Sequence, residues 1–155
     1  MTGISGGAMS RAEELGRLEK EVGVLIRRVR RVIGERARAV HRDLQPASYL
    51  MLTHLASEGP QRSSVMAERF NVDKGAISRQ VQHLSDLGLL QREPDPVDGR
   101  ATLISASPEA VLRMEALDRD RRKWLDGQLA EWSEEDLREF VSGLARYNTA
   151  LDQNL

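Results

Sequence analysis

The sequence predicts a mainly α-helical protein that carries one small β-hairpin. Aromatic residues make up only 4% of the 155 residues, which disfavours an all-β sandwich or barrel. Near the N-terminus, apolar residues recur at alternating steps of three and four, as they do along one face of a helix. The run "DPVDGR", residues 95–100, consists largely of turn formers between two short extended runs, which predicts the hairpin.

Composition excludes several classes of site. The chain contains no cysteine, which excludes disulfides, thiolate metal sites and cysteine nucleophiles. The N-terminal run "MTGISGGAMS" lacks the pattern of a signal peptide, and residues 1–9 are expected to form a disordered tail. No apolar run approaches the ~20 residues that a membrane span needs. We therefore expect a cytoplasmic protein with no membrane partner.

A long N-terminal helix is predicted within residues 10–43. Ser10 and Glu13 have the spacing of a capping box, in which each side chain accepts a hydrogen bond from the other residue's backbone N–H. The apolar seam that follows is typical of a helix that packs along another helix. Its members are Leu15, Leu18, Val22, Leu25, Val29 and Val32.

Three shorter helices are predicted to follow. Pro46 suits the first position of one helix, Ser63 or Ser64 begins the next, and Asp73 caps a third that Gly88 ends. The side chains expected to face inward from the first two are Tyr49, Leu50, Leu52, Leu55, Val65, Met66 and Phe70.

After the hairpin, Ser107 with Pro108 begins one helix, and Ser133 with Asp136 forms a second capping signal before the last. Charge is divided unevenly along the chain, although the net charge is only −1. Residues 11–43 carry ten Lys and Arg against six Asp and Glu, whereas residues 108–155 carry seven against eleven. The arginines of residues 27–42 are interpreted as a solvated face that pairs with the acidic C-terminal helices, with an arm for nucleic acid as the alternative.

The helix that Asp73 begins hides one face and shows another. On a helical wheel, the apolar residues Ile77, Val81 and Leu84 lie together, and Arg79 and Gln82 lie opposite them. The major groove of DNA admits one α-helix, where arginine can pair with guanine and glutamine with adenine. Together with the preceding helix, the tight turn and the hairpin, this pattern predicts a winged helix-turn-helix.

Further predicted contacts surround these two side chains. Lys74 and Ser78 can reach phosphates, and Gly75 allows the backbone to approach DNA closely. Arg100 at the hairpin tip is a candidate for the narrow minor groove. Asp95 and Asp98 are expected to brace the turn and to hold Arg100 by charge-assisted hydrogen bonds. The predicted DNA-binding residues are Ser63, Ser64, Lys74, Gly75, Ser78, Arg79, Gln82, His83 and Arg100.

The centre of the chain resembles the MarR family of bacterial transcriptional regulators. The resemblance is carried by "VMAERFNVDKGAISRQVQHLSDLGLLQRE" and by "DPVDGR", which fits the family's D-x-x-D-x-R wing pattern. It implies a winged helix-turn-helix over residues 44–106 and a homodimer whose dimerisation helices lie in residues 10–43 and 107–155. It also implies a palindromic operator and, often, a small aromatic or phenolic effector. Gln45 and Ala110 depart from the family, which commonly has threonine and glycine there.

The remaining candidates concern ligands and catalysis. His41, Tyr49, His54 and Trp124 are interpreted as a possible effector pocket, although such residues more often belong to a core. No histidines lie at metal-ligand spacing and no catalytic motif is present, so neither a metal, a cofactor nor an enzyme is expected. We predict a DNA-binding transcriptional regulator, in the form of a ligand-responsive repressor on a pseudo-palindromic operator. The alternative is a winged helix that contacts another protein and has no specific DNA affinity.

Overall fold

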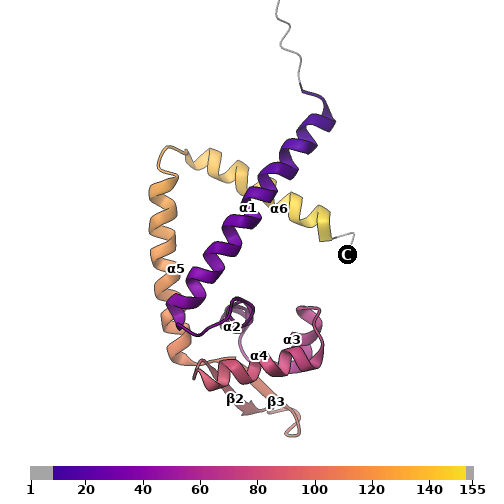
Figure 1. The fold of residues 1–155 in the computed structure, drawn as a ribbon, viewed down its shortest axis with the longest axis vertical. Helices are drawn as coiled ribbons and strands as arrows, with labels where there is room; N and C mark the ends of the chain where they lie inside the picture. Colours follow the sequence, from indigo (N-terminus) through magenta and orange to yellow (C-terminus); the bar gives the residue numbers. More distant parts are fainter. Residues whose placement is uncertain (1–8, 153–155) are drawn as a thin grey trace, which may run out of the picture. The chain divides into compact units, whose positions relative to one another are not determined.

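The computed structural model describes residues 9–152 (Figure 1). The chain forms two compact units, one ending at Met114 and the other starting at Glu115. Most of the predicted disordered tail, residues 1–9, lies outside the described residues. The elements in order are α1 (Arg11–Val40), α2 (Pro46–Glu58), β1 (Gln61–Arg62), α3 (Ser63–Arg69), α4 (Lys74–Asp86), β2 (Leu90–Pro94), β3 (Thr102–Ala106), α5 (Pro108–Gln128) and α6 (Glu134–Asp152).

Helix α1 begins at the predicted capping box. The backbone N–H of Ser10 donates to Glu13 Oε2 at 2.7 Å, and the backbone N–H of Glu13 donates to Ser10 Oγ at 3.3 Å. The hydrogen bond from the Ser10 backbone holds the pKa of Glu13 below its ordinary value. The helix ends where His41 adopts an extended conformation, so its predicted length is confirmed.

The small sheet has three antiparallel strands in the order β1-β3-β2. Strands β2 and β3 form the predicted hairpin, with Leu90 opposite Ala106 and Pro94 opposite Thr102. Strand β1 was not predicted from the sequence, because its two residues, Gln61 and Arg62, lack any apolar alternation. It pairs with the far side of β3 and leads directly into α3, so the hairpin is joined to the helix-turn-helix through the sheet.

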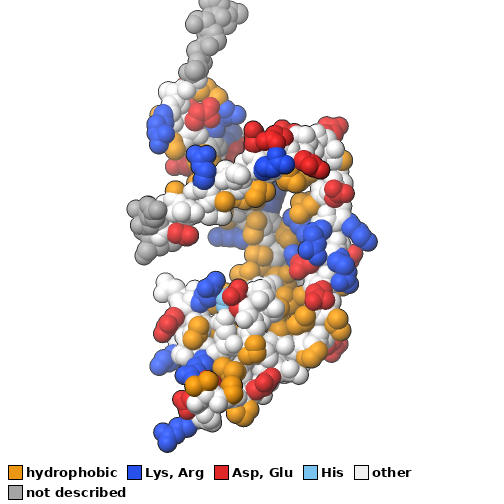
Figure 2. All heavy atoms as spheres, turned by 180° about the vertical axis from the view of Figure 1, so that it is seen from behind, with side chains coloured by type: hydrophobic (Ala, Val, Ile, Leu, Met, Phe, Trp, Pro, Cys, Tyr) orange, Lys and Arg blue, Asp and Glu red, His pale blue; other side chains and the backbone are white. Residues whose placement is uncertain are grey.

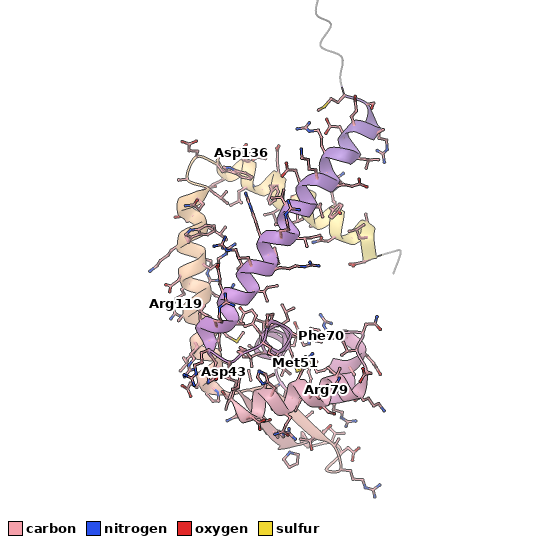
Figure 3. All side chains as sticks on the ribbon, in the orientation of Figure 1. Asp43, Met51, Phe70, Arg79, Arg119 and Asp136 are labelled. Carbon is pink, nitrogen blue, oxygen red and sulfur yellow. The ribbon has the colours of Figure 1, made fainter. Side chains whose placement is uncertain are left out.

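The core of the first unit lies between α2, α3, α4 and the sheet. The fully buried apolar side chains include Met51, which Figure 3 labels, and Leu52, Leu55, Met66, Ile77, Leu84, Leu89 and Ile104. Two expectations for this core are wrong, since Leu50 is 41% exposed and Val65 is 45% exposed. At ~100° per residue, Leu50 lies opposite Leu52 and Leu55 on the helix, and Met51 takes the inner position instead.

The second unit contains α5 from Glu115 onward and all of α6. The predicted capping signal is confirmed: the backbone N–H of Ser133 donates to Asp136 Oδ2 at 2.8 Å, and that of Asp136 donates to Ser133 Oγ at 3.1 Å. The hydrogen bonds from Ser133, its hydroxyl first, lower the pKa of Asp136. Trp132 meets Phe140 edge to face with the ring centroids 5.6 Å apart. No residue of α6 is buried within the described part of the chain.

Much of the apolar surface of the single chain stays exposed (Figure 2). The exposed apolar residues of α1 are Leu15, Leu18, Leu25, Ile26 and Val29, and those of α6 are Leu137, Phe140, Val141, Leu144 and Leu151. Among residues 9–152, no helix is both long and apolar enough to cross a membrane.

Candidate nucleic-acid interface

Helix α4 presents the face that the sequence predicts for DNA. Its N-terminus is fixed by Asp73, whose Oδ1 accepts a hydrogen bond from the backbone N–H of Ala76 at 2.8 Å. Its buried side chains are Ile77, Val81 and Leu84. The exposed residues are Lys74, Gly75, Ser78, Arg79 and Gln82, and His83 is half-buried at the flank. The arginine, labelled in Figure 3, and the glutamine are therefore exposed on a helix whose start and inner face are both anchored.

Gly75 has a structural role in addition to the predicted close approach to DNA. A Cβ atom at this position would lie 2.9 Å from Asp73 Oδ1, the oxygen that caps the helix. It would also lie 3.4 Å from Arg79 Nη1. Because non-bonded carbon and oxygen atoms do not approach to 2.9 Å without repulsion, a larger residue requires the Asp73 carboxylate to shift.

Gln82 is held by a neighbour on the same helix. Its Nε2 donates to Asp86 Oδ1 at 2.7 Å, across one helical turn. An ionised carboxylate can only accept, so this contact fixes which end of the Gln82 amide is nitrogen. Within residues 9–152 the amide oxygen and the second N–H of Gln82 have no other hydrogen-bond partner, and they are the acceptor and donor that adenine requires. The sequence analysis did not identify Asp86 as the partner of Gln82.

Helix α3 packs against α4 and precedes it in the chain. Ser63 and Ser64 are its first two residues, with Ser63 half-buried and Ser64 exposed. The turn between α3 and α4 is tight, because Asn71 takes a positive φ of 48° and the backbone N–H of Val72 donates to the Ala67 carbonyl at 3.1 Å. Asparagine tolerates this left-handed conformation better than most residues.

The wing contains an ion pair that the sequence did not predict. Asp95 is buried, and its Oδ2 accepts from Arg62 Nε at 2.6 Å and Nη2 at 2.5 Å. Within residues 9–152 no carboxylate forms an ion pair with the exposed Arg100 guanidinium, so the expected charge-assisted hydrogen bond to Arg100 is made to its backbone and not to its side chain. Asp98 Oδ1 instead accepts from the Arg100 backbone N–H at 3.2 Å.

The other oxygen of Asp95 braces the turn itself. Asp95 Oδ1 accepts from the backbone N–H of Val97 at 2.8 Å. This hydrogen bond, and after it the one from Arg62, holds the pKa of Asp95 below its ordinary value. The carboxylate is therefore charged at neutral pH and organises the tip from which Arg100 extends.

The residues predicted to line an effector pocket have contacts within their own units. His54 Nε2 lies 3.2 Å from Gln61 Oε1, and its ring meets Phe70 edge to face at 5.6 Å. His41 Nδ1 accepts from the Asp43 backbone N–H at 3.2 Å, and Tyr49 is buried in α2. Trp124 belongs to the second unit, where the Arg121 guanidinium lies 4.6 Å from its ring centroid. The pocket remains a prediction.

No group of three or more metal-binding side chains occurs among the described residues.

Comparison with known proteins identifies the family. The sequence profile of the MarR family matches residues 42–101, which span the helix-turn-helix and most of the wing. A protein of Bacillus subtilis (strain 168), named "Uncharacterized HTH-type transcriptional regulator YxaD", is 33% identical over 108 residues, or 70% of this chain and 76% of that protein. The chain belongs to the MarR family.

Solved structures confirm the fold of this MarR-family chain. A "probable transcriptional regulator from Pseudomonas aeruginosa" is 27% identical, with a TM-score of 0.55 over 84% of this chain and 98% of that one. The crystal structure of MarR shares the fold at 21% identity, with a TM-score of 0.65 over 88% of this chain and 98% of that one. The protein is therefore a DNA-binding transcriptional regulator with a winged helix-turn-helix, and the prediction that it is not an enzyme is confirmed by its family.

Proposed function

We propose that the protein is a homodimeric repressor that binds a pseudo-palindromic operator through a pair of α4 helices. The observation that carries this proposal is the outer face of α4, where Arg79 and Gln82 are exposed on a helix that is capped by Asp73 and buried on its other side. Two copies related by a two-fold axis present two such helices to major grooves about one helical turn apart. A dimer bound in this way blocks a promoter that overlaps its site.

The proposed contacts differ in what they read. Arg79 and Gln82 meet base edges in the major groove, and the backbone at Gly75 passes close to the DNA. Arg100 enters the minor groove beside it, since arginine is attracted to the negative potential of a narrow groove. Five side chains contact phosphates and set the register without reading sequence. They are Ser63, Ser64, Lys74, Ser78 and His83.

The proposed dimer uses residues 10–43 and 107–155. Leu25 and Val29 of α1 are 46% and 45% exposed, and Phe140 of α6 is 53% exposed. Large apolar side chains left exposed along a helix suit an interface with another subunit. We expect Val29→Glu to convert the dimer into monomers in sedimentation experiments, with a larger loss of affinity for a palindrome than for a half-site.

The proposal also includes relief of repression by a small aromatic or phenolic molecule, which the family resemblance implies. Its proposed contacts are His41, Tyr49, His54 and Trp124. A panel of phenolic acids, titrated against the preformed protein–DNA complex, should contain compounds that release the DNA. Release by none of them would contradict this part of the proposal.

Arg79 and Lys74 provide the matched test of DNA reading. Arg79→Ala should weaken binding to the operator by ~1–3 kcal/mol and relax the preference at one base pair, because the guanidinium meets a base edge. Lys74→Ala should weaken operator and random DNA alike and reduce the slope of log affinity against log salt by about one. Equal losses on operator and random DNA for Arg79→Ala would contradict its base-reading role.

A further inference from the structure

The wing tip is organised around one buried carboxylate. Asp95 Oδ2 accepts both hydrogen bonds of Arg62, at 2.5 and 2.6 Å, and its side chain is only 8% exposed. Its Oδ1 accepts from the backbone N–H groups of Val97 at 2.8 Å and Asp98 at 3.4 Å. A partly buried pair that shares two hydrogen bonds differs from the usual exposed ion pair, whose geometry is loose and whose effect is small.

The contacts continue from Asp95 to the residue at the tip. The backbone N–H of Asp95 donates to the Ala101 carbonyl at 2.9 Å, which closes the loop. The backbone N–H of Ala101 donates to the Asp98 carbonyl at 2.9 Å, and that of Arg100 donates to Asp98 Oδ1 at 3.2 Å. The backbone that carries the Arg100 side chain is thus fixed through a short series of hydrogen bonds that starts at Asp95.

Arg62 connects Asp95, and with it the wing tip, to the helix-turn-helix. It lies in β1, opposite Leu103 of the central strand, and the next residue, Ser63, begins α3. The hairpin strands themselves end at Pro94 and Thr102. Beyond that point, the Arg62 side chain holds the tip against the rest of the domain through its contact with Asp95 Oδ2.

We infer that Arg62 is a positioning residue for DNA recognition, which acts through Asp95 to hold Arg100 at a set distance and direction from α4. The inference rests on the proposed entry of Arg100 into the minor groove. Without the Arg62–Asp95 pair, the tip keeps its hairpin but loses its fixed orientation, and Arg100 must be ordered at the moment of binding. That ordering costs conformational entropy and therefore affinity.

The sign of the effect at Asp95 separates this role from simple electrostatics. Removal of a negative charge from a DNA-binding surface ordinarily strengthens binding, because the phosphates are repelled less. Asp95→Asn should instead weaken binding, because an asparagine amide cannot form the charged pair with Arg62. Asp98→Asn is the matched control: it removes the same charge from the same loop, but its amide oxygen can still accept from the Arg100 backbone.

The experiment measures affinity for the selected operator by fluorescence anisotropy across a salt series. The variants are Arg62→Gln, Asp95→Asn, Asp98→Asn, Arg100→Ala and the double variant Arg62→Gln/Arg100→Ala, each checked by circular dichroism. We expect Arg62→Gln and Asp95→Asn to weaken binding about equally, by up to about tenfold. In the Arg100→Ala background, Arg62→Gln should add no more than about twofold, because the residue that it positions is already absent. Asp98→Asn should bind as tightly as the wild type or more tightly.

Three results would overturn the inference. Tighter binding by Asp95→Asn would show that the aspartate acts only by its charge. In the second result, the affinity losses of Arg62→Gln and Arg100→Ala multiply in the double variant, and the slope of log affinity against log salt falls by about one for Arg62→Gln but not for Asp95→Asn. That combination would show that Arg62 contacts a phosphate directly. An Arg100→Ala variant with unchanged affinity would remove the proposed minor-groove contact and the inference together, while leaving the major-groove reading by α4 intact.

Hydroxyl-radical footprinting of Asp95→Asn tests the inference even if Arg62→Gln loses stability, because it does not use that variant. Asp95→Asn should lose protection of the minor groove at the wing while the protection centred on α4 is retained. Equal protection at both places in Asp95→Asn and wild type would contradict the positioning role.

Discussion

Replacement of Gly75 by alanine should change the stability of the protein far less than helix propensity alone suggests. Glycine within a helix costs about 1 kcal/mol relative to alanine, so the substitution gains up to that amount. The new Cβ, however, would lie 2.9 Å from Asp73 Oδ1, so this oxygen must shift, and we expect the shift to break its 2.8 Å hydrogen bond with the Ala76 backbone N–H. Loss of an aspartate N-cap costs ~1 kcal/mol, so the two effects nearly cancel.

Two further variants isolate these opposing effects. Asp73→Ala alone should lower the free energy of unfolding by ~1 kcal/mol, since it removes the cap. In that background, Gly75→Ala should recover up to about 1 kcal/mol, because no carboxylate remains for the Cβ to displace. Gly16→Ala in α1 is the matched control, since a Cβ there meets nothing within 4 Å, and it should stabilise by about 1 kcal/mol.

Urea unfolding followed by circular dichroism measures all four differences, at one fixed protein concentration because subunit association contributes to stability. If Gly75→Ala stabilises the protein as much as Gly16→Ala does, the carboxylate has room to move without loss of the cap and the reasoning is refuted. The same variant bears on DNA binding. A stability-neutral Gly75→Ala that loses operator affinity would support the close approach of the backbone to DNA at this position.

Three more predictions follow from single contacts. Asp136→Asn should destabilise the protein at pH 6, and the difference from the wild type should disappear as the pH falls through the lowered pKa of Asp136, because the carboxylate stabilises the fold only while it is ionised. Urea unfolding at several pH values measures this difference. A difference that does not change with pH would contradict the capping role. Leu84→Ala should cost ~2–5 kcal/mol, because the side chain is fully buried on the inner face of α4, and operator binding should decline in step with the unfolded fraction measured by circular dichroism. Asp86→Ala should relax the preference for adenine at the base pair that Gln82 reads, because it releases the amide held at 2.7 Å, and site selection from random DNA would reveal an unchanged preference if the contact has no role.

The features that the sequence predicted well are those set by neighbouring residues. The caps at Ser10, Asp73 and Ser133 each depend on a hydrogen bond to a residue three positions away, so the spacing of two residue types is enough to find them. The inner and outer faces of α4 follow in the same way from the 3.6-residue period of a helix. The Gln82–Asp86 contact could also have been found, since its partners are four residues apart on one helix.

The features that the sequence did not predict depend on residues brought together by the fold. Arg62 and Asp95 are 33 positions apart, and nothing in the local sequence of either identifies the other. Their contact arises because β1 pairs with β3, and β1 is too short to produce an alternating pattern.

The exposed side of α2 was missed for a different reason. Leu50, Met51 and Leu52 are all apolar, so the sequence gives no contrast from which to choose the outward residue.

Selection of binding sites from a random pool of double-stranded DNA, followed by titration of the selected site and a scrambled control across a salt series, is the most direct test of a dimeric DNA reader. We predict enrichment of a pseudo-palindrome whose half-sites lie about one helical turn apart. Its affinity should exceed that of the control by a factor of ~10³ or more and should fall steeply as salt rises. No enrichment, or equal affinity for the selected and scrambled sequences, would contradict sequence-specific recognition by the exposed face of α4.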